Sequence, residues 1–317
     1  MRKLLCLAVS LSLALFLLAP SLPAHQAKGT SQIGVVRIAM IQSLFRGRDP
    51  ATLLALTQPF GELLYTQTGI RGDFCISPDV ADVGERLQRG DVQLAVLHGV
   101  EYGWLREKQP DVQPLALAFN QTIHLKALVI VRNDNPARKL SDLKGKRCCL
   151  PTRSLNHCFL YLHKAITDEG HVPTGFFQPG PTTARVDYAL DYVYEGTVAL
   201  TVIDGVSWEV YRSHKPGRAA RLRILCESPV FPTAAIVYRP AGADPILTKQ
   251  FVERLSKAHE TAFGRQLLTL WRISGFSSVP ADYNAMVDNI LKEYPKPLEP
   301  ADFFAQASGV PNTATGR

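Results

Sequence analysis

Residues 73–98 read DFCISPDVADVGERLQRGDVQLAVLH, and this stretch decides the class of fold. The short segments at 73–77 and 92–98 have the length and apolar content of buried strands. Between them, residues 81–88 have the pattern of an amphipathic helix. A strand, a helix and a strand within this length are typical of a parallel sheet with crossover helices. The stretch therefore predicts an α/β fold.

The same alternation precedes and follows this stretch. VVRIAMI at 35–41 predicts a buried strand, and 51–69 predicts the helix that comes after it. Two further strands, at 114–119 and 124–132, follow without a helix between them. The polar joint at 133–146 then separates this first unit from the rest of the chain.

A second alternating unit begins after the joint. It has a strand near 147–150, an amphipathic helix, a strand at 197–204 and another at 221–228. The chain then returns through a strand at 234–240, and the segment from 244 to 294 is expected to be helical. One alternating unit is therefore inserted into the other.

An inserted unit requires the chain to cross between two lobes twice, near 130–133 and near 229–233. Two crossing strands form a hinge, and ligands of open α/β sheets bind at the carboxyl ends of the strands. We expect an α/β protein of two lobes, each a mostly parallel sheet flanked by helices, joined by a two-strand hinge. The expected parts of the chain are a signal peptide (1–24), a terminal lobe (33–130 plus 232–294), an inserted lobe (131–231) and a C-terminal tail (295–317).

The N-terminus has the features of a secretory signal peptide. Arg2 and Lys3 precede an apolar run from residue 4 to 19, and Pro20 with small residues follows. Cleavage is expected near Ala24 or Ala27. A membrane anchor is the competing interpretation, but the run is shorter than the roughly 20 residues that a spanning helix needs.

Net charge and cysteine content limit the kinds of ligand and disulfide that the protein can have. The formal net charge of +7 falls to +5 once Arg2 and Lys3 leave with the signal peptide. This scattered positive charge suits a small anionic ligand and is too weak for a nucleic-acid partner. The five cysteines that remain after cleavage leave their pairing open, although Cys148 and Cys149, adjacent on a strand, should point to opposite faces and remain buried thiols.

Several stretches together resemble a known family. They are VRIAM at the mature start, LQRGDVQLAVLHGVEYGWL, ALVIVRNDNPARKLSDLKGKRCCLPTRSLNHCFLYLHKAITDEG and SPVFPTAAIVYR. The chain is similar over roughly 35–294 to the phosphate/phosphite/phosphonate-binding family of ABC-transporter periplasmic substrate-binding proteins. The resemblance implies a two-lobed periplasmic binding-protein fold, a small oxyanion as ligand and a membrane permease as partner. It implies a monomer with no catalytic activity, no cofactor and no metal.

The loop before the second-lobe helix is the first candidate ligand site. Residues 150–163 read LPTRSLNHCFLYLH, and Ser154 is expected to cap the helix that follows. A helix N-terminus carries free N–H groups and partial positive charge, so it attracts anions. The family's loop usually reads Ser-Thr-Ser-Gly; the matching stretch here retains Ser154 and has Leu155, Asn156 and His157. Ser154, Asn156 and His157 are therefore predicted to bind the ligand.

Other candidates follow strand ends or open a helix at the same edge: Arg46, with Ser43 and Phe45 beside it; Tyr102, with His98; Thr183; and Asp204. Arg46 would grip the oxyanion with its guanidinium group, unless it faces solvent. The alternative role for Tyr102 is that of a core residue. In the family, a carboxylate near Asp204 serves an amino group or a protonated phosphonate oxygen of the ligand, whereas its structural role would be to cap the helix that follows.

Three alternatives belong to other classes. Cys158, His157 and Asp204 have the chemistry of a nucleophilic enzyme, but neighbouring helical residues point about 100° apart. Cysteine and histidine residues at 148–163 could capture a metal, although none has the close spacing of structural zinc sites. A periplasmic sensor that signals to a membrane receptor kinase would have the same fold.

Overall fold

The structure is a computed structural model that describes residues 35–45, 50–152, 154–241, 245–298 and 301–304. All of these residues belong to one compact unit that begins at Gly34. The predicted signal peptide and Arg46 lie outside the described residues. Within the described ranges, each helix is too short or too polar to span a bilayer.

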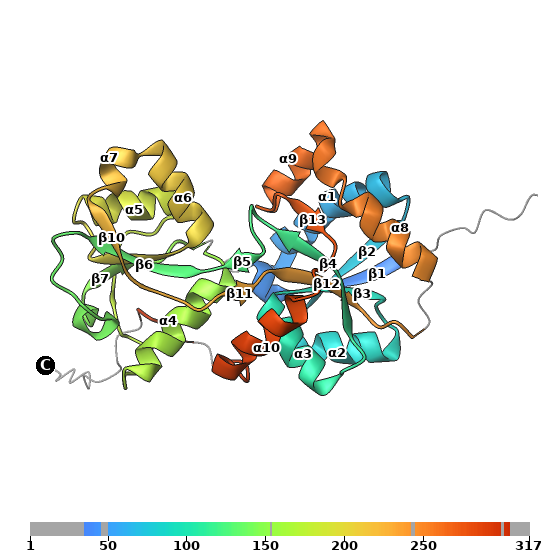
Figure 1. Ribbon diagram of the computed structural model, residues 1–317, viewed down its shortest axis with the longest axis horizontal. Helices are drawn as coiled ribbons and strands as arrows, with labels where there is room; N and C mark the ends of the chain where they lie inside the picture. Colours follow the sequence, from blue (N-terminus) through green and yellow to red (C-terminus); the bar gives the residue numbers. More distant parts are fainter. Residues whose placement is uncertain (1–34, 46–49, 153, 242–244, 299–300, 305–317) are drawn as a thin grey trace, which may run out of the picture. The chain divides into compact units, whose positions relative to one another are not determined.

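The first sheet has six strands in the order β13-β4-β12-β3-β1-β2 (Figure 1). The parallel part is formed by β1 (Val36–Ile41), β2 (Gly72–Ser77) and β3 (Leu94–Leu97). The antiparallel part adds β12 (Ala234–Tyr238), β4 (Gln113–Phe119) and β13 (Gly275–Ser277). The sheet is therefore mixed, because β12 and β13 run opposite to β1, β2, β3 and β4.

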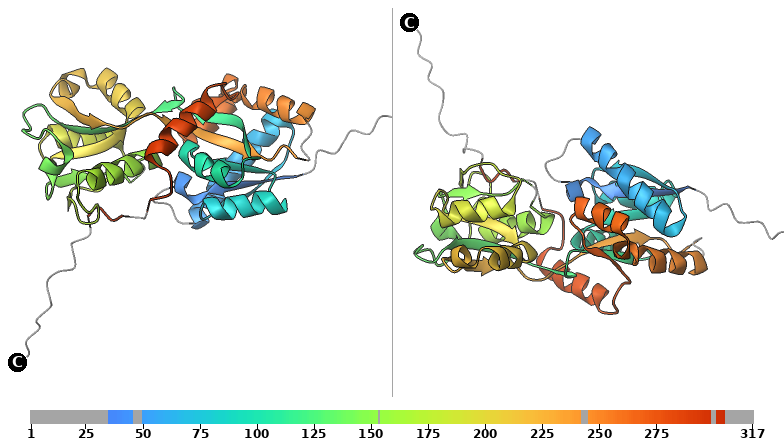
Figure 2. Two further views of the ribbon diagram at one scale, coloured as in Figure 1. Left: turned by 60° about the horizontal axis from the view of Figure 1, so that its bottom comes forward. Right: turned by 90° about the horizontal axis from the view of Figure 1, so that it is seen from above.

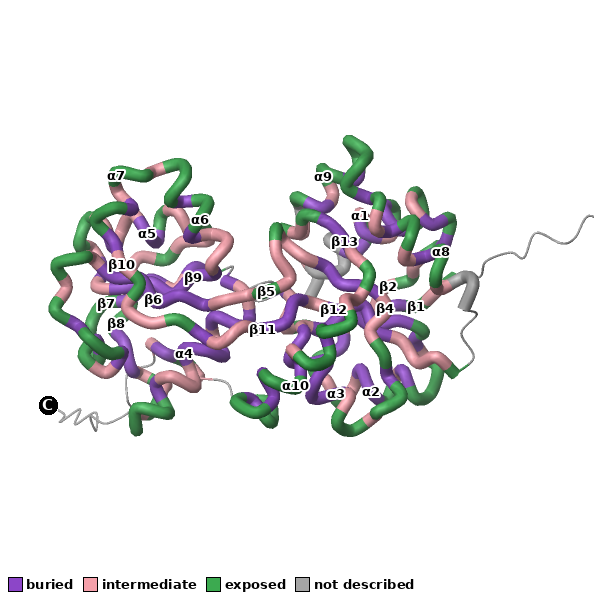
Figure 3. The backbone as a smooth tube through the Cα atoms, in the orientation of Figure 1, coloured by how far each residue is buried: buried purple, intermediate pink, exposed green. Residues whose placement is uncertain are grey.

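Helices cover both faces of this sheet (Figure 1). One face carries α1 (Pro50–Thr68), α8 (Pro245–Leu255) and α9 (Ala262–Leu270), with the short helices η1 (Gln42–Phe45) and η3 (Ala258–Glu260). The other face carries α2 (Val80–Arg89), α3 (Gly99–Lys108) and α10 (Tyr283–Glu293). Their apolar side chains bury the central strands on both sides, which is the cause of the continuous apolar runs seen in the sequence (Figure 3).

The second sheet has five strands in the order β10-β6-β9-β7-β8. These strands are β10 (Leu222–Glu227), β6 (Ala127–Arg132), β9 (Leu200–Asp204), β7 (Arg147–Cys149) and β8 (Gln178–Pro179). One face is covered by α4 (Asn156–Asp168), which follows η2 (Leu140–Leu143) and β7, and the other by α5 (Val186–Tyr194), α6 (Gly205–His214) and α7 (Pro216–Ala219) (Figure 2). Cys148 and Cys149 belong to different core clusters, so they point to opposite faces as predicted.

Two short antiparallel strands form the hinge between the sheets. They are β5 (His124–Leu125) and β11 (Phe231–Pro232). The second crossing coincides with the one predicted near 229–233. The first lies earlier than the predicted 130–133, because β6 pairs along its length with β9 and β10 of the second sheet. The limits of the lobes stay a prediction, and a limit drawn on the sheets would precede Ala127.

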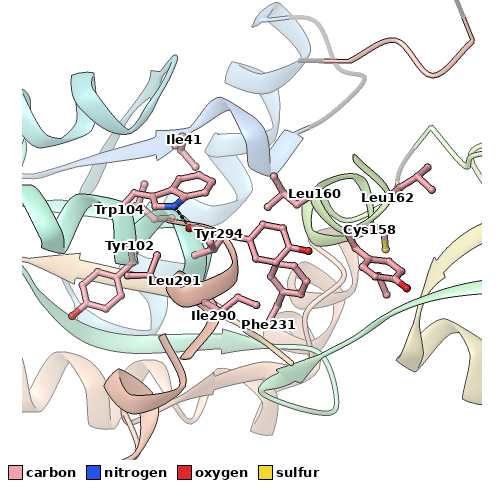
Figure 4. Close-up of a cluster of buried hydrophobic side chains, with 14 of the residues drawn as sticks. Ile41, Tyr102, Trp104, Cys158, Leu160, Leu162, Phe231, Ile290, Leu291 and Tyr294 are labelled. Atoms are coloured by element: carbon pink, nitrogen blue, oxygen red, sulfur yellow. Dashed lines mark hydrogen bonds between the residues drawn. The ribbon is translucent and has the colours of Figure 1, made fainter. Parts of the chain in front are cut away.

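Apolar side chains run without interruption from α3 to α4 beside the hinge (Figure 4). Phe231 of β11 is 1 % exposed and packs against Tyr294, with 5.0 Å between ring centroids. On the α4 side the ring of His157 lies 5.7 Å from that of Phe231. The Trp104 indole N–H donates to the Tyr294 carbonyl at 2.7 Å and ties α3 to the end of α10. The hinge strand is therefore part of the core.

Part of the predicted C-terminal tail also packs on the second sheet. The backbone N–H of Gly175 donates to the carbonyl of Asp302, and that of Phe177 donates to the carbonyl of Phe303. Phe303 is buried and its ring lies near Phe159 of α4. The chain thus returns to the second sheet after α10, a connection that the sequence pattern did not indicate.

Gly99 provides a test of hinge packing. A Cβ at this position would lie 2.5 Å from the Pro232 carbonyl oxygen, whereas a Cβ at Gly217 would meet nothing within 4 Å. We expect Gly99→Ala to lower the free energy of unfolding by about 1–3 kcal/mol through overpacking. Gly217→Ala, also in a helix, should leave it unchanged or raise it slightly. Urea unfolding of both variants measures the difference, and equal stabilities would contradict close packing of α3 on β11.

Candidate functional site

A cavity of about 190 Å³ lies where the first sheet, the hinge and the start of α4 meet. Strands β1, β3, β4 and β12 contribute its floor, and residues 154–157 and 271–276 contribute its sides. Its polar lining residues are Ser43, His98, Asn120, Ser154, Asn156, His157, Thr233 and Arg272. Three of these, Ser154, Asn156 and His157, come from the loop singled out in the sequence.

The loop before α4 has a different local structure from the one predicted. Helix α4 begins at Asn156 with Leu155 at the N-cap position, so the prediction that Ser154 caps the helix was wrong. The Ser154 N–H donates to the Pro151 carbonyl at 2.9 Å and closes a turn, which places Ser154 one residue before the cap. The Thr152 N–H donates to the Thr183 carbonyl and holds the turn against the neighbouring loop.

Ser154 is therefore available for something other than capping. The residue is 7 % exposed, and its hydroxyl has no hydrogen-bond partner among the residues that the structure describes. A buried hydroxyl without a partner loses its hydration without compensation, which is unfavourable by about 1–3 kcal/mol. Since this hydroxyl belongs to a residue that lines the cavity, a bound polar molecule would satisfy it.

His157 is a neutral side chain in this environment. It is 5 % exposed, and burial lowers its pKa to about 4, against a smaller opposing effect of the Asp204 carboxylate. Its Nε2 lies 3.3 Å from the Lys126 carbonyl, which only accepts, so Nε2 carries the proton of the neutral ring. Nδ1 is then an acceptor.

A buried carboxylate positions two lining residues on the side of the first sheet. Glu101, 4 % exposed, accepts a hydrogen bond from the Ser43 hydroxyl at 2.6 Å and another from the His98 backbone N–H at 3.0 Å. The His98 Nε2 atom is buried and has no partner. Ser43 and His98 are thus held at the ends of η1 and β3, facing the same cavity.

The turn after α9 contributes two further polar side chains, those of Trp271 and Arg272. The Trp271 indole N–H is buried and lacks a partner, and Trp271 lines the cavity. Arg272 follows with φ of 55°, a left-handed conformation. The Arg272 N–H donates to the Thr269 carbonyl and the Ile273 N–H donates to the Leu268 carbonyl, the paired hydrogen bonds of a Schellman motif. Glycine is the usual residue at this position because it avoids the steric cost of about 1 kcal/mol.

Within the described part of the chain, three residues that line the cavity therefore have a buried polar atom without a partner: Ser154 Oγ, His98 Nε2 and Trp271 Nε1. Native proteins leave few such atoms unpaired, and each one requires an explanation. Their occurrence in residues from three separate segments indicates a site for a ligand with several hydrogen-bonding atoms.

The other predicted residues lie elsewhere. Tyr102 is 1 % exposed, stacks on Tyr283 and donates to Asn284 Oδ1 at 3.1 Å, so it is a core residue of the α3–α10 contact. Thr183 supports the loop through its carbonyl and accepts from the Arg185 N–H. Asp204 caps α6 by accepting from the N–H and hydroxyl of Ser207. None of the three lines the cavity.

Several lining residues were missed by the sequence analysis: Asn120, Thr233, Trp271 and Arg272. Asn120 directly follows the strand β4, so its position at a strand end was a usable signal. Trp271 and Arg272 lie in a segment that was predicted to be helical throughout, and β13, which follows them, was also missed. No short pattern in the sequence marks the turn between α9 and β13.

Cys158 is buried beside His157. Its Sγ lies 3.7 Å from His157 Nε2, and burial raises the pKa of the thiol well above its usual range. A protonated thiol is a poor nucleophile. Among the described residues, no three His, Cys, Asp or Glu side chains are grouped closely enough to hold a metal ion.

Comparisons with known proteins identify the family and the fold of the chain. A family model described as "ABC transporter, phosphonate, periplasmic substrate-binding protein" matches residues 45–283. None of the curated proteins compared matches the chain.

Three solved structures have a similar fold. XAC2383 from Xanthomonas citri, bound to chloride ion, is 18% identical, with 82% of this chain and 97% of that chain covered and a TM-score of 0.54. PhnD1 from Prochlorococcus marinus, in complex with methylphosphonate, is 13% identical, with 82% and 98% covered and a TM-score of 0.53. PA3383 from Pseudomonas aeruginosa, a binding protein component of an ABC phosphonate transporter, is 15% identical, with 82% and 87% covered and a TM-score of 0.52. At these identities the likeness concerns the fold alone.

The low pKa of His157 makes stability depend on pH. The unfolded chain binds a proton at His157 below pH 6.5, but the folded protein does so only below about pH 4. The free energy of unfolding should therefore fall as the pH decreases through this range, by roughly 3 kcal/mol at most. His157→Gln should reduce this fall, whereas His124→Gln, at an exposed histidine, should not. Urea unfolding at several pH values measures both, and identical pH profiles for the wild type and His157→Gln would contradict the assignment.

Proposed function

Since the chain belongs to the family of periplasmic substrate-binding proteins of phosphonate ABC transporters, we propose that it captures a small oxyanion and delivers it to a membrane permease. The oxyanion is phosphate, phosphite or a phosphonate. The family consists of transporter binding proteins and not of enzymes. The protein would act as a monomer in the periplasm after removal of its signal peptide.

The observation that carries this proposal is the set of unpartnered polar atoms in the cavity. Ser154 Oγ and Trp271 Nε1 are hydrogen-bond donors, and His98 Nε2 becomes one in the appropriate tautomer or when protonated. The oxygens of a phosphonate accept several hydrogen bonds, and bonds to a charged group are stronger than those between neutral groups. The first turn of α4 adds partial positive charge next to Ser154.

Arg272 supplies a full positive charge at the cavity. Arg272 also lines a second, wider hollow, and the linings of this hollow and of the cavity have Asn120, Leu155 and Ile273 in common. Arg272 therefore lies where the two meet. An arginine with a positive φ carries a steric cost that glycine would avoid, and residues with strained backbone of this kind are concentrated at functional sites. We infer that its guanidinium group attracts the oxyanion and neutralises its charge.

Capture would couple to closure of the lobes. Ser154 and Asn156 approach the ligand from the inserted lobe, while His98 and Trp271 approach it from the terminal lobe. A ligand that contacts both lobes stabilises the closed form more than the open one and shifts the population toward it. The permease would then recognise the closed form.

The first test concerns Ser154. Phosphate, phosphite or methylphosphonate should raise the melting temperature of the wild-type protein, and Ser154→Ala should weaken the binding of that ligand about 10- to 100-fold, the equivalent of one charge-assisted hydrogen bond. Ser141→Ala is a matched control, because Ser141 also has a buried hydroxyl without a partner but lies outside the cavity. Calorimetric titration measures each affinity. A protein that binds none of these oxyanions would contradict the proposed function.

The second test separates charge from stability at Arg272. Arg272→Gly should leave the stability of the ligand-free protein unchanged or raise it by about 1 kcal/mol, because glycine adopts positive φ freely. Its affinity for the oxyanion should nevertheless fall about tenfold, since one charged contact of roughly 1.5 kcal/mol is lost. Gln121→Gly is the matched control: Gln121 has φ of 61° and does not line the cavity. Unchanged affinity in Arg272→Gly would remove Arg272 from the binding site.

A further inference from the structure

The inner part of the cavity is an apolar wall. It is formed by the aromatic side chains Phe45, Phe60, Trp271 and Phe276. Their rings pack on one another, with centroids 5.6 Å apart for Phe45 and Trp271, 5.5 Å for Phe60 and Trp271, and 6.0 Å for Phe60 and Phe276. This mutual packing gives the wall a defined shape that does not depend on a ligand. We call these four residues the aromatic wall.

The space in front of the aromatic wall is open because the side chains of the sheet are small there. Ala118 of β4 and Ala234 of β12 lie directly opposite each other in the sheet register, and both line the cavity. Met40, Val96 and Ile236 complete the floor. A larger side chain at either alanine position would occupy this space. The open volume therefore depends on the small size of the side chains at these two positions.

The cavity is also larger than an inorganic oxyanion requires. Its volume of about 190 Å³ is more than ten times the roughly 10–15 Å³ that a cavity needs on the same measure to hold one water molecule. A phosphorus atom with four substituents, as in phosphate or methylphosphonate, fills only part of that volume. Apolar side chains form the other part of the lining, so the space in front of them offers few hydrogen-bond partners to an ordered water molecule.

The charges around the cavity argue against a cationic substituent on the ligand. Among the described residues that line it, no Asp or Glu is present, and Arg272 carries the full positive charge. An ammonium group buried here would lose its hydration without a carboxylate to compensate it, which is strongly unfavourable. The buried Glu101 already accepts from Ser43 and His98, and the buried Asp204 already accepts from Ser207.

We propose that the ligand is an organophosphonate with an apolar substituent, a short alkyl chain or a phenyl ring, that lies against the aromatic wall. The phosphonate oxygens contact the polar residues, and the carbon substituent fills the space in front of Phe45, Phe60, Trp271 and Phe276. This inference rests on the proposed function, because it requires the phosphonate group to bind at Ser154.

Affinities for methyl-, butyl- and phenylphosphonate test the proposal. Each methylene that is buried should increase the affinity about fourfold, which is about 0.8 kcal/mol, so butylphosphonate should bind about 50-fold more tightly than methylphosphonate. The heat-capacity change of binding should become more negative along the series, as expected for burial of apolar surface. Isothermal titration at several temperatures gives both quantities on the wild-type protein.

A variant that fills the space localises the effect. Ala234→Leu should abolish the gain from the longer substituent, so that the ratio of butyl- to methylphosphonate affinity falls from about 50 to near one. Ala165→Leu is the matched control, a half-buried alanine of α4 outside the cavity, and should keep the ratio of the wild type. If Ala234→Leu does not fold, the affinities of the wild-type protein for methyl-, butyl- and phenylphosphonate still test whether the ligand has an apolar substituent.

The outcomes distinguish this inference from the proposed function. Equal or weaker binding of butyl- and phenylphosphonate relative to methylphosphonate would overturn the apolar substituent and leave oxyanion capture intact. A 50-fold gain that persists in Ala234→Leu would overturn the placement against the aromatic wall. Failure of all phosphonates and of phosphate to bind would overturn both.

Discussion

The packing of Phe231 between His157 and Tyr294 is the constraint on which the rest of the site depends. Phe231 belongs to the hinge strand β11, and its ring is in contact with the start of α4 on one side and the end of α10 on the other. Because the ring is fully buried, the loop at 154–157 cannot move away from the hinge without exposing apolar surface. This contact brings the hydroxyl of Ser154 into the same cavity as His98 and Trp271.

The site combines a polar environment and an apolar one, as ligand pockets commonly do. At one end, buried polar atoms lack partners, which destabilises the empty protein by a few kcal/mol in total on the usual scale of about 1–3 kcal/mol per atom. At the other end, aromatic rings pack on one another and form an apolar wall. Oxyanion capture uses the first environment, and discrimination among phosphonates would use the second. Glu101 links the site to the fold, since it orients Ser43 and His98 from within the core.

Much of the fold was predictable because it follows from local patterns. The strands β1, β3 and β4, the helix α1 and the insertion of one unit into the other follow from apolar periodicity alone. The candidate site was only partly predictable. Ser154, Asn156 and His157 were singled out because they lie at the start of a helix after a strand, and they line the cavity, whereas Tyr102, which also follows a strand end, packs against α10. A position after a strand places a residue at the edge of the sheet where ligands bind. It does not determine whether the side chain then faces the cavity or a neighbouring helix.

The sequence by itself determined the two-lobed α/β architecture, the family and the loop that opens α4, because apolar periodicity, turn residues and helix starts depend on neighbours along the chain. Only the tertiary structure decided which residues share a cavity. Trp271 and Arg272 join Ser154 across more than a hundred residues of chain, and Ala118 and Ala234 create space only as neighbours in one sheet. Hydrogen-bond satisfaction and empty volume are properties of atoms that are close in space, and no pattern in the sequence specifies them before the chain folds.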